Sequence, residues 1–297
     1  MSKLCAYLII AHEDFDILKK TLAILDDEQA DFYLHIDKKV KDKKLCDELA
    51  KCVNKSGITF VEPVDVQWGS FTQIQSEIIP MKAALNHGKY SYIHLLSGVD
   101  MPLKTPSQIN AFLKENMGKE FIDIDENAMR TKSHYQRVAF YHLFQQKVGK
   151  NKSGVLYYMQ KGLVSAQKLL HINRIRNIES FFYKGANWFT ITYEMAEYIA
   201  DEIEKLYKLF RHSICADEVF LQSIAMNSPY KDNIVNDFLR LIDWKRGDPY
   251  TFCNDDFEEL ITSDKLFARK FSTKKDSIII ERLYDYLMKQ KTNEGQH

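Results

Sequence analysis

Two adjacent carboxylates, Asp217 and Glu218, are the residues whose type and spacing most suggest chemistry. They lie between apolar residues and precede a run with helical spacing. The ordinary explanation is that acids at a helix start cap free N–H groups and complement the helix dipole. The alternative is a catalytic base, because apolar neighbours such as Val219 and Phe220 would raise the pKa of a carboxylate. The pair alone leaves both explanations open.

Polar side chains also follow the ends of apolar segments. His12 follows the run 4–11, and Asp37 ends the segment 31–37. Parallel strands end at the same edge of a sheet, so these side chains are expected to meet where α/β proteins bind ligands. The alternatives to ligand binding are a structural role for His12 and a solvent-exposed position for Asp37. Neither GxGxxG nor GxxxxGK[ST] follows the first strand, which disfavours dinucleotide-binding and P-loop sites.

Composition narrows the class of protein. Lys and Arg number 41, as do Asp and Glu, so bulk charge gives no reason to expect a nucleic-acid partner. The five cysteines include no CxxC pair, which favours free thiols in a reducing cytosol. No apolar stretch approaches the roughly 20 residues of a membrane span. We therefore expect a cytoplasmic protein, whose basic stretch 147–176 could associate peripherally with the anionic inner face of the cell membrane.

The elements that must position these residues alternate between strands and helices. The first 37 residues read as a βαβ unit, and the alternation continues to residue 125, as in a nucleotide-binding α/β sheet. From Ser133 to Arg176 the sequence becomes polar and helical, which predicts an insert. The predicted strands are 4–11, 31–37, 58–61, 91–96, 120–125, 185–192 and 240–244, and the predicted helices include 15–25, 45–53, 73–85 and 194–210.

Six segments in this order resemble a known family. They are His35-Ile36-Asp37-Lys38-Lys39, Trp68-Gly69-Ser70, the run 96–103, the run 185–190, the Asp217-Glu218 segment and the run 266–271. Together they are similar to the core-2/I-branching β-1,6-N-acetylglucosaminyltransferases, whose relatives include the peptide O-xylosyltransferases. The chain resembles a compact bacterial-type member, because it lacks the membrane anchor and the disulfide cysteines of Golgi relatives.

The resemblance implies a GT-A fold, with a mixed, mostly parallel sheet flanked by helices and a helical insert on the acceptor side. It implies one domain over 1–297, with a nucleotide-sugar-binding half (1–125) and an acceptor-binding, catalytic half (126–297). Members of the family invert the anomeric centre and need no divalent metal or other cofactor. The implied partners are a UDP-sugar donor, UDP-GlcNAc first, and a glycan or lipid-linked oligosaccharide acceptor. Asp123-Ile124-Asp125 has the spelling of a metal motif, but we interpret it as a coincidence at a strand end.

The same resemblance assigns roles to individual residues. Glu218 is the implied general base, with Asp217 as its orienter or a helix cap. Lys270, with Arg269 beside it, is the implied phosphate clamp, and Tyr250 stands where relatives carry a basic residue nearby. Lys245 or Arg246 could substitute for that residue. The donor pocket is expected to include His12, Asp37 and Asp100. The expected substrate contacts are Trp68, Arg137, Trp188 and Trp244, and the alternative for each of the three tryptophans is structural packing.

Overall fold

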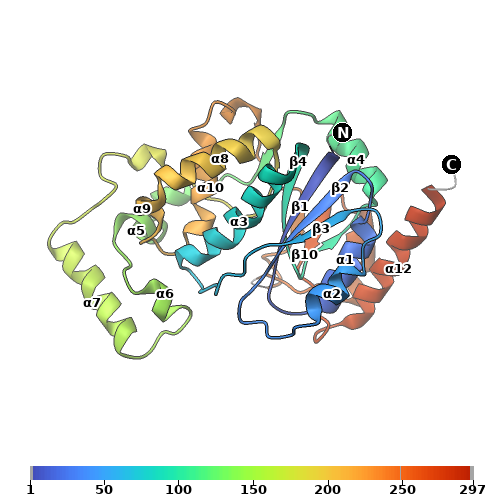
Figure 1. Ribbon diagram of the computed structural model, residues 1–297. Helices are drawn as coiled ribbons and strands as arrows, with labels where there is room; N and C mark the ends of the chain where they lie inside the picture. Colours follow the sequence, from blue (N-terminus) through green and yellow to red (C-terminus); the bar gives the residue numbers. More distant parts are fainter. Residues whose placement is uncertain (1–2, 248, 295–297) are drawn as a thin grey trace.

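The long apolar runs of the sequence form the centre of a sheet, because strands covered on both faces bury every side chain. In the computed structural model, which describes residues 3–247 and 249–294, the main sheet has the order β3-β2-β1-β4-β7-β6-β8 (Figure 1). β1 pairs in parallel with both β2 and β4, and β2 pairs in parallel with β3. These four strands are β1 (Lys3–Ala11), β2 (Ala30–Ile36), β3 (Gly57–Phe60) and β4 (Tyr90–Ser97).

The sheet changes direction beyond β4. β7 (Phe189–Thr192) is antiparallel to β4 and to β6 (Glu120–Ile122), and β6 is parallel to β8 (Ile234–Val235). A second, three-stranded sheet has the order β5-β10-β9, and it consists of β5 (Met101–Pro102), β10 (Phe267–Arg269) and β9 (Arg240–Ile242). The predicted mixed, mostly parallel sheet flanked by helices is therefore confirmed.

Helices cover both faces of the main sheet. Ala6 and Leu8 of β1 pack into one apolar cluster with α3 (Phe71–His87), α8 (Tyr193–Lys205) and α10 (Phe220–Met226). Tyr7 and Ile9 point the other way, toward the helices of the opposite layer. That layer is built from α1 (Phe15–Leu25), α2 (Leu45–Ala50), α4 (Pro106–Glu115), α11 (Phe257–Thr262) and α12 (Ser277–Glu294).

The predicted insert is helical and extends away from the sheet, at the left of Figure 1. It comprises η1 (Ala128–Arg130), α5 (Lys132–Ala139), α6 (Gln145–Val148), α7 (Val155–Leu169) and η2 (Glu179–Phe181). The single helix predicted over 194–210 is wrong in one respect, since it breaks at Leu206 into α8 and α9 (Tyr207–Phe210). The short η3 (Ala216–Glu218) then carries the acid pair.

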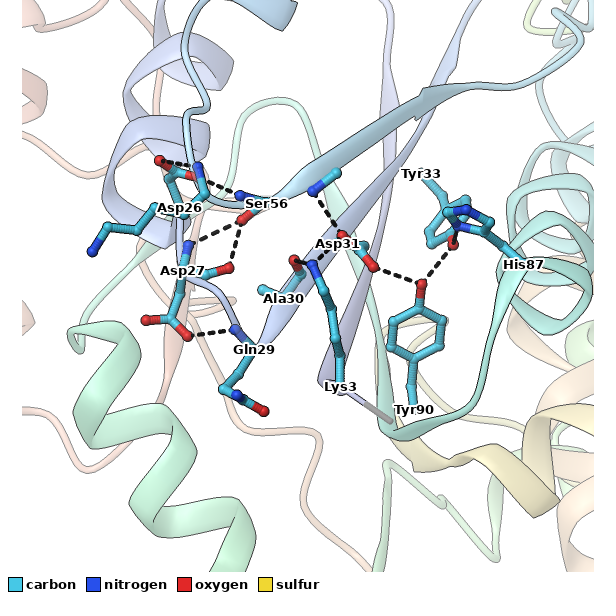
Figure 2. Close-up of polar contacts among 12 residues, drawn as sticks. Lys3, Asp26, Asp27, Gln29, Ala30, Asp31, Tyr33, Ser56, His87 and Tyr90 are labelled. Atoms are coloured by element: carbon cyan, nitrogen blue, oxygen red, sulfur yellow. Dashed lines mark hydrogen bonds and ion pairs between the residues drawn. The ribbon is translucent and has the colours of Figure 1, made fainter. Parts of the chain in front are cut away.

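The amino end of the parallel sheet is closed by a saturated polar network (Figure 2). Asp31 accepts from Lys3 Nζ at 2.7 Å, from the Gly57 N–H at 2.7 Å and from Tyr90 Oη at 2.9 Å. The carboxylate of Asp26 accepts from the backbone N–H groups of residues 54, 55 and 56. These groups have their partners inside the protein, so this end has a structural role.

Candidate active site

The carboxyl ends of β1, β2 and β4 open into a cleft of about 500 Å³. Nine of the twelve predicted site residues line it, contributed by segments far apart in the chain. They are His12, Asp37, Trp68, Trp188, Asp217, Glu218, Trp244, Arg269 and Lys270. The other three, Asp100, Arg137 and Tyr250, lie behind its walls and contact residues that line it or adjoin it.

Glu218 is held by two cations from the insert side of the cleft. Arg137 Nη1 lies 2.7 Å and Lys184 Nζ 3.1 Å from the same oxygen, Oε2. Burial alone would raise the pKa of Glu218, but the charges of Lys184 and Arg137 hold it below its usual value. The expectation that apolar neighbours such as Val219 and Phe220 raise the pKa of Glu218 is wrong, because the charges of Lys184 and Arg137 outweigh the effect of burial. Glu218 is therefore ionised at neutral pH, with about a third of its side chain exposed.

Asp217 occupies a different environment from its neighbour. Its Oδ2 accepts from Gln73 Nε2 at 2.8 Å, while Oδ1 is buried without a partner among the described residues. Burial and the charge of Glu218 raise the pKa of Asp217 to about 7. The expectation of a helix cap is wrong, since neither η3 nor α10 receives a side-chain cap. Two adjacent acids thus have pKa values displaced in opposite directions.

A third carboxyl group lies beneath this pair. Glu77 of α3 is 1% exposed and accepts from Asn187 Nδ2 at 3.3 Å. Burial and the nearby charge of Asp217 raise the pKa of Glu77 well above its usual range. Sequence reasoning missed it, although a signal was present. Glu77 is an acid on the apolar stripe of α3 that includes Ile74, Ile78 and Met81.

Two close backbone approaches position η3. The carbonyl of Gly69 accepts from the Cys215 N–H at 2.9 Å, and the carbonyl of Glu218 accepts from the Gly185 N–H at 3.1 Å. Gly69 adopts a φ of +70° in the turn that Ser70 caps to start α3. A Cβ at Gly185 would lie 1.8 Å from the carbonyl oxygen of Asp123. The segments around Gly69 and Gly185, which resemble the family, therefore hold α3, η3 and the start of β7 close together.

Arg269 also lines the cleft. Its guanidinium stacks on the ring of Trp188 at 4.1 Å, and its Nε lies 3.6 Å from Asp100 Oδ1. The Arg269 Nη1 atom is buried and has no hydrogen-bond partner among the described residues. Asp100 is fully buried and accepts from the Ser97 N–H at 2.9 Å. We expected Asp100 to contact the nucleotide-sugar donor directly. In the structure it is buried and instead holds the side chain of Arg269.

The remaining predicted residues complete the rim. Asp37 is 5% exposed and accepts from the Lys39 N–H at 2.8 Å, whereas His12 is exposed beside it in the cleft wall. Trp68 and Trp244 are 43% and 59% exposed, so both offer ring faces to a ligand. Trp188 is 9% exposed and belongs to the core cluster while one face carries Arg269.

Tyr250 does not line the cleft. Its ring lies 4.3 Å from the guanidinium of Arg246, which pairs with Asp243, Asp256 and Glu259. Arg246 is thus engaged by three carboxylates and is not available to replace a phosphate-binding residue at this position. Lys150 of the insert also joins the lining of the cleft.

Metal ligands do not gather in the part of the chain that the structure describes, where no group of three or more His, Cys, Asp or Glu side chains could hold an ion. Asp123 and Asp125 serve the backbone instead. The carboxylate of Asp123 accepts from the Ala186 N–H at 2.7 Å, and that of Asp125 accepts from the Asn127 N–H at 3.0 Å. Desolvation raises the pKa of the partly buried Cys215 to about 12, which disfavours a reactive thiolate at this position.

Known proteins with similar sequences include xylosyltransferases and a β-1,6-N-acetylglucosaminyltransferase. Dog xylosyltransferase 2 is 23% identical over 308 residues, which cover 94% of this chain and 33% of the dog protein. The bovine beta-1,3-galactosyl-O-glycosyl-glycoprotein beta-1,6-N-acetylglucosaminyltransferase is 22% identical over 316 residues, 95% of this chain and 69% of that protein. The chain thus spans about a third of the length of the xylosyltransferases it matches.

A solved structure, mouse xyloside xylosyltransferase 1 in its apo form, is similar with a TM-score of 0.38 and 10% identity, covering 90% of this chain and 97% of that one. The model of the "Branch: Core-2/I-Branching enzyme" family matches residues 5–266, nearly the whole span over which the six sequence segments occur. This chain belongs to the core-2/I-branching enzyme family of glycosyltransferases.

Proposed function

We propose that the chain is an inverting, metal-independent glycosyltransferase that moves a sugar from a UDP-sugar to a hydroxyl group of a glycan. The observation that carries this proposal is one cleft that is lined both by the carboxylates of Asp217 and Glu218 and by the cations Arg269 and Lys270. Inverting transfer needs a base for the acceptor hydroxyl and a stabiliser for the leaving diphosphate. In this cleft the carboxylates can supply the base, and Arg269 and Lys270 can stabilise the diphosphate.

Glu218 is the proposed base. Both of its cationic partners bind Oε2, so Oε1 carries no hydrogen bond from any residue that the structure describes. An ionised, partly exposed oxygen in the cleft is suited to accept the proton of an acceptor hydroxyl. Asp217 has a pKa nearer neutrality, but its free oxygen is buried. A general base must first lie within hydrogen-bond distance of the acceptor hydroxyl, and only then does its pKa matter. This criterion favours Glu218 over Asp217.

The diphosphate is proposed to bind at Arg269 and Lys270. Arg269 lines the cleft, and its stacking on Trp188 fixes the plane of the guanidinium that would donate to the phosphate oxygens. Lys270 adds a second cation to the lining of the cleft. In this proposal the two side chains supply the positive charge that a divalent ion supplies in other enzymes that use nucleotide sugars.

For the donor we propose UDP-GlcNAc, with UDP-xylose or another hexose donor as the alternative. The named relatives include both a β-1,6-N-acetylglucosaminyltransferase and xylosyltransferases. For a bacterial-type member, the acceptor would be a capsule, an exopolysaccharide or a lipid-linked oligosaccharide precursor.

The test is an assay of UDP release. The protein is incubated with UDP-GlcNAc, UDP-xylose, UDP-glucose and UDP-galactose in EDTA, with a panel of simple glycosides as acceptors. We expect release with one donor, enhanced by an acceptor and unaffected by EDTA. Release that disappears in EDTA and returns with Mn²⁺ would contradict the metal-free mechanism. Glycan binding by calorimetry without release from any donor would instead indicate a binding protein that has lost turnover.

A further inference from the structure

One stretch of this electrically balanced chain contains no acidic residue at all. Residues 127–178, which we call the basic insert, carry ten of the 41 Lys and Arg residues and none of the 41 Asp and Glu residues. It includes α5, α6 and α7 and projects away from the sheet (Figure 1). A positive excess concentrated on one projecting body creates a local field although the net charge of the chain is zero.

The same segment exposes an unusual amount of apolar surface. Of the fourteen large hydrophobic side chains exposed in the described part of the chain, ten belong to the basic insert. Val155, Tyr158 and Leu169 of α7 are 76%, 65% and 79% exposed, and Leu170 beyond the helix is 69% exposed. Exposed hydrophobic residues scattered singly need no explanation, whereas a concentration beside one another marks an interaction surface.

A helix at a protein surface normally buries its apolar side chains and exposes its polar ones, and α7 has the opposite arrangement. Its buried positions include two glutamines, Gln160 and Gln167. Gln160 Oε1 accepts from the Phe144 N–H, and Gln167 Oε1 accepts from the Tyr141 N–H, both at 2.8 Å. These bonds fix the polar residues on the inward side and leave Val155, Tyr158, Met159 and Leu169 outward at helical spacing.

Cations flank this apolar stripe without acidic partners. Lys161 lies 5.3 Å from the ring of Tyr157, and Lys168 lies 5.6 Å from the ring of Phe140. Neither forms an ion pair with a carboxylate of residues 3–247 or 249–294. An apolar stripe bordered by lysines on one helix is the pattern of helices that lie in the interface of a bilayer.

The basic insert also adjoins the active site. A groove of about 380 Å³ between α6 and α7 is lined by Lys150, Lys152, Lys161 and Lys168, and it shares Trp68 and Lys150 with the catalytic cleft. An acceptor held at a lipid surface by this groove would lie next to Glu218's cleft. Among the described helices, none is long and apolar enough to cross a membrane.

We propose that the outward face of α7 docks on an anionic lipid bilayer. The exposed stripe inserts among the headgroups and acyl chain ends. The four lysines that line the groove contact lipid phosphates; they are Lys150, Lys152, Lys161 and Lys168. A second copy of the same face is disfavoured as the occupant, because two carboxylate-free surfaces would repel each other.

Co-sedimentation of the full chain with vesicles tests this proposal and requires no donor or acceptor. We expect binding to phosphatidylcholine vesicles that contain phosphatidylglycerol, and much weaker binding to phosphatidylcholine alone. Removing the charge at Lys161→Gln with Lys168→Gln should weaken the partition coefficient about fivefold for each lysine. The matched pair Lys89→Gln with Lys114→Gln, on other exposed surfaces, should leave binding unchanged.

A second pair of variants tests the apolar stripe. Val155→Ser with Leu169→Ser should lower binding by about tenfold or more, whereas Ile278→Ser, at another exposed apolar residue (62%), should have no effect. Circular dichroism and thermal melting check that each variant is folded. The proposal is wrong if anionic vesicles fail to bind the folded wild type, or if both pairs of variants bind as the wild type does. Dimer formation abolished by the same serine variants, with no vesicle binding, would assign the face to self-association.

Discussion

Arg137 Nη1 lies 2.7 Å from Oε2 of Glu218, although 81 positions separate the two residues. The contact fixes the carboxylate from the insert side while the backbone of Glu218 is tied to Gly185 on the sheet side. Lys184 adds a second cation at 3.1 Å. The proposed base is therefore held in an orientation that depends both on the insert and on the segment that leads into β7.

Removing Lys184 should change the pH dependence of the reaction. The charges of Lys184 and Arg137 lower the pKa of Glu218, and the base works when ionised. In Lys184→Gln that pKa rises, so the acidic limb of the kcat/KM profile should move to higher pH. UDP release measured from acidic to neutral pH checks the shift, with Lys205→Gln on exposed α8 as the control. An unchanged acidic limb would show that Glu218 does not control it.

Asp217 should make stability depend on pH with a definite sign. The pKa of Asp217 is raised from 3.8 to about 7, so the folded state retains a proton that the unfolded chain releases. This contribution to stability is fully present below the unfolded pKa of 3.8 and is lost as the pH rises through the folded pKa of about 7. The unfolding free energy should therefore fall between these two pH values. In Asp217→Asn this fall should shrink by a few kcal/mol at most.

Urea unfolding at several pH values between 4 and 8 measures that slope. Glu77 titrates in the same direction, so some slope should remain in the variant. Asp201→Asn, at an exposed position of α8, is the matched control and should keep the wild-type slope. Equal slopes for the wild type and Asp217→Asn would contradict the raised pKa.

Much of the site follows from local sequence patterns, and the remainder depends on long-range contacts. His12 and Asp37 could be placed because they end parallel strands, whose carboxyl ends share an edge. The Glu218–Arg137–Lys184 cluster could not, because nothing in the local spacing indicates which cations an insert will bring to η3. Asp100 was placed at the right strand end, but its burial beneath Arg269 depends on how β10 packs.

Arg269 should control donor affinity more than the chemical step. Its guanidinium, which lines the cleft, is the proposed donor to a phosphate oxygen, and a hydrogen bond to a charged group contributes about 1.5–3 kcal/mol. Arg269→Gln should therefore raise the KM for the UDP-sugar and the Kd for UDP by roughly ten- to hundredfold. Calorimetry with UDP measures the Kd, and Arg282→Gln on α12 is the control. UDP affinity equal to that of the wild type would place the diphosphate elsewhere.

Gly185 should tolerate no side chain. A Cβ there would meet the Asp123 carbonyl at 1.8 Å, and two backbones would have to separate. We expect Gly185→Ala to lower the unfolding free energy by about 3 kcal/mol or more, since well-packed backbone has no room to relax. Gly88→Ala is the matched control, because a Cβ at that position meets nothing within 4 Å. Equal melting temperatures for the two variants would contradict this close approach.

The most direct test of the central claim compares acceptor-dependent UDP release by the wild type, Glu218→Gln and Asp217→Asn. Glu218→Gln keeps the shape of the side chain and removes its basicity. We expect it to lower kcat by about 10²–10⁴-fold with UDP affinity within a few fold of the wild type, and Asp217→Asn to retain more activity. Glu218→Gln turning over at the wild-type rate, or Asp217→Asn being the inactive variant, would contradict the assignment of Glu218 as the base.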